Sequence, residues 1–159
     1  MDIYIGGKRV RVNPDDPATH KGKGGEADII DIGGGQVLKL YKQPQHPDLA
    51  GDTLQQQLVA ARLKELQRKL RDFPANLPTR VVAPTALATN TKGQIMGYTM
   101  PYLASAEILL SYAKKNFRMR GISQAMMLRI LRDMHRTVAA LHGQRVVIGA
   151  SVGIALCPD

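Results

Sequence analysis

The residues best suited to chemistry in this chain are glycines in a short loop and a lysine that follows them. Residues 22–27 read Gly-Lys-Gly-Gly-Glu-Ala, and Lys39 lies within the apolar run 37–41. A glycine-rich turn lets backbone N–H groups approach phosphates, and a lysine on a neighbouring strand reaches the same phosphates as a point charge. The pattern therefore indicates a phosphate-binding hairpin, and a glycine-rich hairpin that binds no ligand stays open as the alternative.

Two strands are expected to position that lysine. Residues 27–32 are rich in isoleucine and end at three consecutive glycines, 33–35. This favours a strand and a tight turn over the helix that a dinucleotide-binding fingerprint requires. Lys39 lies between Leu38 and Leu40, and it shares its strand face with Val37 and Tyr41. An edge-strand lysine that limits aggregation is the alternative interpretation.

The remaining pattern predicts an α+β fold with an antiparallel sheet first. Alternating residues around Gly6-Gly7 predict a hairpin over 3–12, and apolar residues at three- and four-residue steps predict a helix over 53–71. Further strands are expected at 81–84 and 94–100, a short helix at 106–117, and a long helix at 123–141. The expected apolar face of that long helix is Met127, Ile130, Leu131, Met134, Val138 and Leu141.

Composition narrows the possible environments and partners. The net charge is +9, which suits nucleotide phosphates, nucleic acid or an acidic protein partner. With no Trp and only 2 Phe there is no aromatic platform for single strands, so nucleic acid is the less expected partner. No apolar run approaches the length of a membrane span, and no signal-peptide core is seen near the N-terminus. Cys157 is the only cysteine, which excludes disulfides within the chain, and a cytoplasmic location is expected.

The order of these features resembles the protein-kinase fold, in particular divergent bacterial kinase-like proteins. The resemblance covers about residues 18–149. It implies an N-terminal lobe over 1–103, in which a helix packs on the sheet, and a partial helical C-terminal lobe over 104–159. The residues that carry it are Gly22, Gly24 and Gly25, Lys39, Glu65 on the first long helix, Met100 to Leu103 as a hinge, and Leu141-His142.

The resemblance implies a role for each of these positions. Residues Gly22, Lys23, Gly24 and Gly25 would cover the phosphates of ATP, and Lys39 would contact the α- and β-phosphates. Glu65 would pair with Lys39, with Glu26 as a rival partner. Backbone groups at Met100 and Tyr102 would bind the adenine edge. Mg²⁺ is the metal ion that the family uses with ATP.

The chain departs from the family where catalysis is concerned. Ala150 stands where the catalytic aspartate is expected, and Ala155 stands where the metal-binding asparagine is expected. No Asp-Phe-Gly segment occurs. The resemblance thus implies ATP binding with no catalytic or metal-binding residue, as in a kinase fragment or a catalytically inactive kinase. Residues 148–159 also resemble a strand of GGDEF domains, although the cyclase signature is absent.

A second hypothesis is a non-enzymatic module that binds an acidic protein partner or the remainder of a larger kinase. The basic charge and the missing catalytic groups motivate it. The other polar candidates are not expected to form a site. His20 and His46 are expected in loops without a carboxylate cluster, and Asp28 and Asp31 are expected to face solvent.

Overall fold

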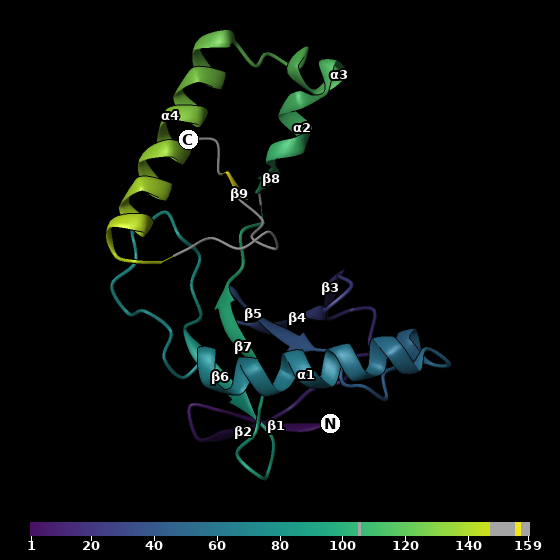
Figure 1. The fold of residues 1–159 in the computed structure, drawn as a ribbon. Helices are drawn as coiled ribbons and strands as arrows, with labels where there is room; N and C mark the ends of the chain where they lie inside the picture. The colour runs from purple at the N-terminus through teal and green to yellow at the C-terminus, as the bar shows by residue number, and fades with distance from the viewer. Residues whose placement is uncertain (105, 147–154, 157–159) are drawn as a thin grey trace. The chain divides into compact units, whose positions relative to one another are not determined.

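The computed structural model describes residues 1–104, 106–146 and 155–156 and divides the chain into two compact units. The first unit comprises Met1–Phe73 and Val82–Tyr102, and the second comprises Pro74–Val81 and Leu103–Asp159. The first carries a curled antiparallel sheet with a helix on it, and the second is mainly helical (Figure 1). The predicted α+β class is confirmed.

The sheet of the first unit has seven antiparallel strands in the order β2-β1-β6-β7-β5-β4-β3. The strands are β1 (Asp2–Ile5), β2 (Lys8–Arg11), β3 (His20–Lys23), β4 (Ala27–Gly33), β5 (Gln36–Tyr41), β6 (Ala86–Thr89) and β7 (Ile95–Pro101). The β1–β2 hairpin turns at Gly6 and Gly7, whose φ angles are 55° and 80°. Two positive φ angles in succession suit a primed turn and favour glycine, so the predicted hairpin over 3–12 is confirmed.

Side chains alternate along β5, so this strand contributes to two apolar clusters, one on each face of the sheet. Leu38 and Leu40 belong to a cluster on one face, which consists of Ile3, Val12, Ile30, Leu38, Leu40 and Ala88. Tyr41 belongs to the cluster on the other face. That cluster consists of Ala27, Tyr41, Leu70 and Ile95, with Leu63, Leu66, Leu87 and Tyr98 packed against it. The second face is therefore the one that the long helix covers.

The long helix of the first unit is α1 (Thr53–Lys69), which follows the short 3-10 helix η1 (Pro47–Leu49). The side chain of Asp52 caps its first turn by accepting a hydrogen bond from the Gln55 N–H at 2.9 Å. Leu63 and Leu66 pack on the sheet, and Gln67 forms hydrogen bonds with the backbone of β7. The predicted helix over 53–71 is confirmed, and it ends slightly earlier than expected.

One predicted strand is misplaced. Residues 81–84 are not a strand, and β6 begins at Ala86. The turn that joins β6 to β7 is fixed by Asn90, whose Oδ1 accepts from the N–H groups of Lys92 and Gln94. Because this turn joins two paired strands, the first of them must end directly before it. Thr89, the last residue of β6, accordingly pairs with Ile95, the first residue of β7. Two of the four residues in 86–89 are alanines, which are depleted in strands, whereas the valines at 81 and 82 favour a strand.

The second unit contains β8 (Glu107–Ile108), α2 (Leu109–Ala113), α3 (Lys115–Arg118), α4 (Gln124–Gly143) and β9 (Ala155–Leu156), and β8 pairs with β9. The single helix predicted at 106–117 is two short helices, because Lys114 has an extended backbone (φ −78°, ψ 126°). The predicted helix at 123–141 is confirmed as α4, with Ser123 as its N-cap. Of the expected apolar face, only Leu141 is buried in the described part of the unit, and Leu131 is 43% exposed.

Within the described residues, no helix is both long enough and apolar enough to cross a bilayer.

Candidate functional site

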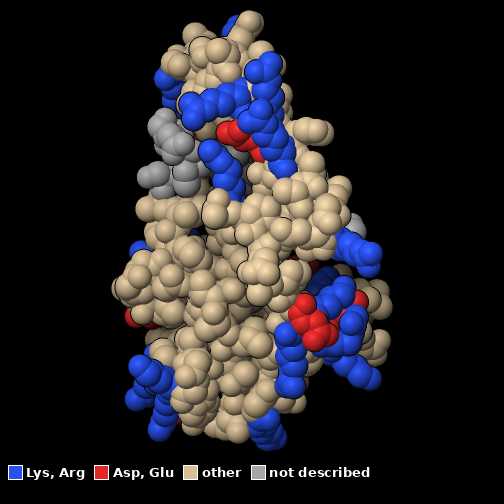
Figure 2. Space-filling view, turned by 90° about the vertical axis from the view of Figure 1, so that its left-hand side faces the viewer, with Lys and Arg blue, Asp and Glu red and all other residues tan. Residues whose placement is uncertain are grey.

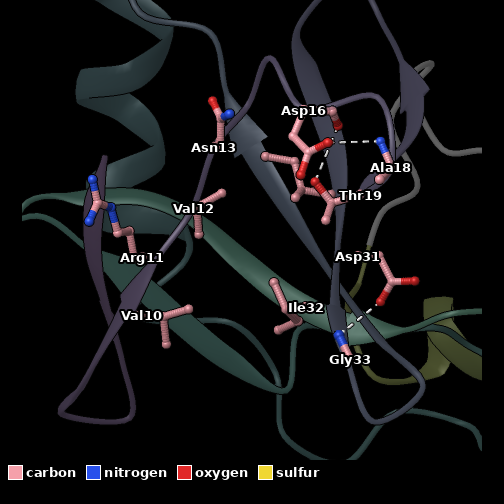
Figure 3. Close-up of a pocket in the computed structure, with 11 residues that line it drawn as sticks. Val10, Arg11, Val12, Asn13, Asp16, Ala18, Thr19, Asp31, Ile32 and Gly33 are labelled. Atoms are coloured by element: carbon pink, nitrogen blue, oxygen red, sulfur yellow. Dashed lines mark hydrogen bonds between the residues drawn. The ribbon is translucent and has the colours of Figure 1, made fainter.

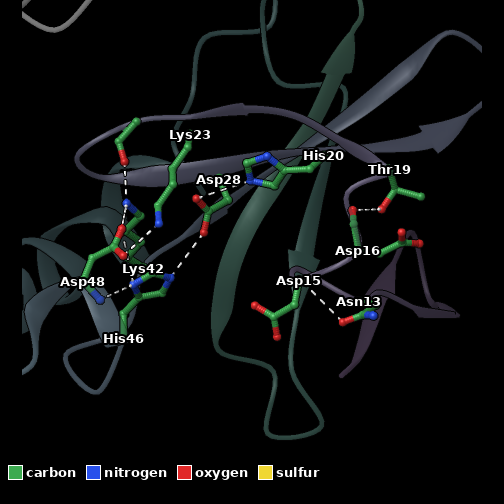
Figure 4. Close-up of polar contacts among 11 residues, drawn as sticks. Asn13, Asp15, Asp16, Thr19, His20, Lys23, Asp28, Lys42, His46 and Asp48 are labelled. Carbon is green, nitrogen blue, oxygen red and sulfur yellow. Dashed lines mark hydrogen bonds and ion pairs between the residues drawn. The ribbon is translucent and has the colours of Figure 1, made fainter.

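The predicted glycine loop is the tip of a β-hairpin. We call β3, the tip at residues 24–26 and β4 the glycine hairpin (Figure 4). Gly22 and Lys23 belong to β3, and Gly24 closes the tip by donating its N–H to the carbonyl of Ala27 at 2.9 Å. A Cβ placed on Gly25 would meet no atom within 4 Å, so the outer side of the tip is open to a ligand.

Lys39 lies in the middle of β5, opposite Ile29 of β4 and Tyr98 of β7. Its Nζ lies 5.7 Å from the ring centroid of Tyr41 and 5.8 Å from that of Tyr98. The side chain is half-buried, and within the described residues it forms no ion pair. Aromatic faces stabilise an ammonium only in part. Lys39 therefore carries a positive charge that a negatively charged ligand would compensate.

The two tyrosines do not supply that negative charge. Their rings meet edge to face with centroids 6.2 Å apart, and Tyr41 is 7% exposed. Burial is the main cause that raises the pKa of Tyr41, and the neighbouring Tyr98 and Glu26 raise it further. Tyr41 is therefore a neutral phenol at physiological pH.

The expected ion pair between Lys39 and Glu65 is not formed. Glu65 instead pairs with Lys69 one turn later on α1, at 2.8 Å, and its side chain is 56% exposed. The hydrogen bond from Lys69 lowers the pKa of Glu65. The reason is helical geometry: Leu63 and Leu66 face the sheet, so Glu65 points toward solvent.

The rival partner, Glu26, does not pair with Lys39 either. Its carboxylate lies 3.0 Å from the guanidinium of Arg62 on α1. This ion pair joins the tip of the glycine hairpin to the helix. Both carboxylates proposed from the sequence thus have other partners.

The predicted hinge runs beside β5, close to Lys39. Met100 pairs with Val37, which is 1% exposed and lies two residues before Lys39 on the same strand face. Tyr102 donates its N–H to the carbonyl of Gly35 at 2.8 Å, so this amide is already used within the sheet. The fold therefore brings Lys39, Val37 and Met100 together, and it places the hairpin tip at the Tyr41 end of the same strand.

The lysine beneath the hairpin tip is Lys42, which the sequence did not single out. Its side chain is 3% exposed, and its Nζ donates to the carbonyl of Gly24 at 2.6 Å. Lys42 follows Leu38 and Leu40 at two-residue steps, so it lies on the sheet face opposite Lys39. The alternation along the strand could have placed Lys42 on this face from the sequence alone. No sequence pattern indicated which groups Lys42 would contact.

Three polar expectations are corrected on that same face. Asp28 is buried at 6% exposed and does not face solvent, since it lies opposite Leu40 in the β4–β5 register. His20 belongs to β3 and not to a loop, and its Nε2 lies 3.7 Å from Asp28 Oδ1. His46 is in a loop, but its Nε2 lies 3.4 Å from Asp28 Oδ2. The two histidines and one carboxylate form a cluster that sequence spacing did not indicate.

A cavity of about 440 Å³ opens elsewhere in the first unit (Figure 3). Its apolar wall includes Val12 and Ile30, which belong to the apolar cluster on the face opposite Lys39. The carboxylates of Asp16 and Asp31 at its rim already accept hydrogen bonds from the N–H groups of Ala18 and Gly33. The cavity contains none of the predicted site residues.

The described residues contain no group of three or more His, Cys, Asp or Glu side chains placed to hold a metal ion. Among these residues there is thus no ready-made cluster of protein ligands for the Mg²⁺ that the kinase resemblance implies. Ala150 and most of the segment that resembles a GGDEF strand lie outside the described residues, and of 148–159 only the backbone pairing of Ala155–Leu156 is described.

No family model matches the chain, and neither a curated protein nor a solved structure matches it.

Proposed function

We propose that this chain is a nucleotide-binding module of protein-kinase type, which binds ATP or ADP and does not transfer phosphate by itself. The order of elements supports the proposal. The glycine hairpin, which consists of β3, its tip and β4, comes first in the sequence. Lys39 follows on β5, and the helix α1 comes next. Protein kinases use a glycine-rich loop, a lysine on the strand after the hairpin, and the following helix in this order.

The observation that carries the proposal is the charge of Lys39, which has no ion-pair partner among the residues that the structure describes. A half-buried ammonium without a carboxylate partner is costly, because burial removes water that would otherwise solvate it. The phosphates of a nucleotide would supply the missing negative charge. They would also lie near Gly25 at the hairpin tip, where a Cβ would meet no atom within 4 Å.

An apolar surface for a base is present on the same face. Ile29 lies opposite Lys39 on β4 and is half-buried. Met100 of β7 is also half-buried, and it lies opposite Val37, which is two residues before Lys39 on the same face of β5. We assign Ile29 and Met100 to the base and Lys39 and Gly25 to the phosphates, because the Gly24 N–H already donates to the Ala27 carbonyl. Because the Tyr102 amide is bonded to Gly35, the adenine edge would be read by other backbone groups of the hinge.

Binding without transfer follows from the same residues. Phosphoryl transfer in kinases requires the paired lysine and glutamate together with metal ligands. Glu65 pairs with Lys69, and alanines stand at the two expected catalytic positions. The proposal includes a cytoplasmic location, where nucleotide is abundant.

A thermal-shift experiment on the full chain tests this function. ADP or ATP at about 100-fold excess over Kd should stabilise the protein by roughly 2.7 kcal/mol, which raises Tm by about 5–10 °C. Lys39→Ala should abolish the shift. Lys92→Ala removes the same charge from the exposed β6–β7 turn and is the matched control, which should keep the full shift.

The wild-type chain must respond to nucleotide, or the function is rejected. If nucleotide raised Tm equally in the Lys39→Ala variant, only the proposed role of Lys39 would be rejected, and nucleotide binding itself would stand. A radiolabelled-phosphate assay should find no transfer by the purified chain, and detectable transfer would reject the second half of the proposal.

A second candidate function is docking of an acidic protein partner, and one feature of α4 favours it. Arg132 and Arg136 are exposed and lie four residues apart, so they lie on one helix face. We call these two residues the basic stripe. Figure 2 shows Lys and Arg side chains gathered around an acidic side chain over this part of the molecule. Asp133, which follows Arg132 on α4, lies 3.7 Å from the guanidinium of Arg80. Arginine suits bidentate pairing with carboxylates.

Salt dependence distinguishes this candidate from the first. Binding of a poly-glutamate peptide should weaken steeply between low and high salt, because exposed charges are screened. Arg132→Ala with Arg136→Ala should weaken it further, and Lys39→Ala should not affect it. If the affinity for the peptide did not change with salt concentration, the basic stripe would be excluded as the docking surface.

A further inference from the structure

The starting point is the buried ammonium of Lys42, on the sheet face opposite the proposed nucleotide site. A buried charge is tolerated only with close partners. Lys42 has two of them: its Nζ donates to the Gly24 carbonyl at 2.6 Å and to Asp48 Oδ2 at 2.7 Å. One side chain therefore connects the hairpin tip to η1, the short helix that precedes α1.

The carboxylate of Asp48 is shared by two lysines. Its Oδ1 accepts a hydrogen bond from Lys23 Nζ at 2.8 Å, and its Oδ2 accepts from Lys42. Lys23 ends the strand that enters the tip, while Lys42 follows β5, and the Lys42 N–H donates to the Glu26 carbonyl at 3.0 Å. Asp48 thus lies where the contacts that hold the tip converge (Figure 4).

A second contact joins the same segments. His46 Nδ1 accepts a hydrogen bond from the Asp48 N–H at 3.1 Å, so we assign the proton of the neutral ring to Nε2. That Nε2 faces the buried carboxylate of Asp28 on β4 at 3.4 Å. This proton assignment leaves no lone pair on Nε2 for a metal ion. We therefore regard the cluster as a structural support for the loop that carries Asp48.

From these contacts we propose that Asp48 is a positioning residue, which fixes the tip of the glycine hairpin through Lys23 and Lys42 and thereby sets nucleotide affinity. The effect on affinity rests on the proposed nucleotide binding. The claim that Asp48 fixes the tip does not depend on nucleotide binding. Asp48 need not touch the nucleotide, because Lys42 and Lys39 lie on opposite faces of the sheet.

The physical reason is the conformational entropy of glycine. Gly24 and Gly25 lose more freedom on ordering than other residues would. A tip already held by Asp48 does not have to be ordered again when a ligand arrives, so the ligand binds more tightly. Without Asp48, the Lys42 ammonium keeps only its bond to the Gly24 carbonyl, and Lys23 loses its carboxylate partner.

Hydrogen exchange combined with ADP titration on the full chain tests the proposal. Asp48→Asn should speed amide exchange of the peptide covering residues 22–27 and weaken ADP binding by about fivefold or more. Asp48→Glu should recover much of both. The matched control is Asp2→Asn, which removes a carboxylate paired with Arg9 in the exposed β1–β2 hairpin and should change neither.

Lys23→Gln provides a milder variant if Asp48→Asn does not fold, since the Lys23 side chain is 55% exposed. Unchanged exchange at 22–27 in both variants would overturn the proposal. Faster exchange with unchanged ADP affinity would overturn the link to binding. If the wild-type chain binds no ADP, the proposed function fails, and the exchange measurement still decides whether Asp48 fixes the tip.

Discussion

Gln67 of α1 and Ile95 of β7 are joined by two hydrogen bonds, in which the Gln67 amide acts as a further strand would. Gln67 Nε2 donates to the Ile95 carbonyl at 2.7 Å, and the Ile95 N–H donates to Gln67 Oε1 at 2.8 Å. This contact fixes the rotation of the helix about its axis. Because Glu65 lies about 200° around the helix from Gln67, the same contact directs Glu65 away from Lys39.

Gln67→Glu should destabilise the first unit by about 1–3 kcal/mol at neutral pH. The carboxylate keeps the shape of the amide but places an acceptor against the Ile95 carbonyl. Below pH of about 4 a protonated Glu regains a donor, so the loss should shrink. Urea unfolding at pH 7 and pH 4 measures it. Gln57→Glu on the exposed side of α1 is the control, and equal losses in both variants would contradict the explanation.

Gly97→Ala should destabilise the protein by about 1–3 kcal/mol or more, because β5 and β7 approach closely at this residue. A Cβ at Gly97 would overlap the carbonyl oxygen of Lys39 and lie 3.2 Å from the Cα of Leu40. The strands would have to separate at the Lys39 site. Gly25→Ala, which meets no atom within 4 Å, serves as the comparison in urea unfolding. A Gly97→Ala variant as stable as Gly25→Ala would show that the sheet accommodates the methyl group.

Leu38→Ala should lower the free energy of unfolding by about 2–5 kcal/mol. Leu38 is fully buried at 0% exposed, so the substitution creates a cavity between β4, β5 and the β1–β2 hairpin. Leu58→Ala, at a site 50% exposed on α1, should cost well under about 1 kcal/mol. Similar unfolding midpoints for the two variants would mean that the described apolar cluster is not the core.

The contribution of Asp48 to stability should disappear in acid. Hydrogen bonds from Lys23 and then Lys42 lower the pKa of Asp48 from 3.8 to about 2. A lowered folded-state pKa stabilises the fold above the unfolded value, and that stabilisation is lost as pH falls from 3.8 through about 2. The difference in urea midpoint between wild type and Asp48→Asn should therefore narrow from pH 5 to pH 2. A difference that stays constant over this range would rule out the carboxylate as its source.

The elements that could be predicted from the sequence are those whose signals are local. Gly6-Gly7 and Gly33 to Gly35 mark turns because the required positive φ angles favour glycine. Apolar residues at helical steps mark α1, and either Asp52 or Thr53 is a suitable cap for its start, of which the structure uses Asp52. The sequence predicted a strand at 81–84, but the strand that forms is β6. Residues 86–89 form it because the turn at Asn90 brings them opposite β7, and intrinsic propensity does not decide the position.

The partners of charged side chains could not be predicted in this way. The sequence order suggested Glu65 or Glu26 as the ion-pair partner of Lys39. Because of the rotation of α1 about its axis, Glu65 instead pairs with Lys69. Glu26 pairs with Arg62. Lys42 and Asp48 are six residues apart, yet their contact depends on where η1 lies. Asp28 is buried because Leu40 is its neighbour across the sheet, which no local pattern states.

The edge-to-face pair of Tyr41 and Tyr98 beneath Lys39 also provides the protein with an intrinsic optical probe. The chain has 5 tyrosines and no tryptophan, so no indole dominates its ultraviolet emission. Two of those phenols flank the ammonium at the proposed phosphate site. Occupancy there would change their quantum yield directly, and unlabelled protein could be titrated in a fluorimeter.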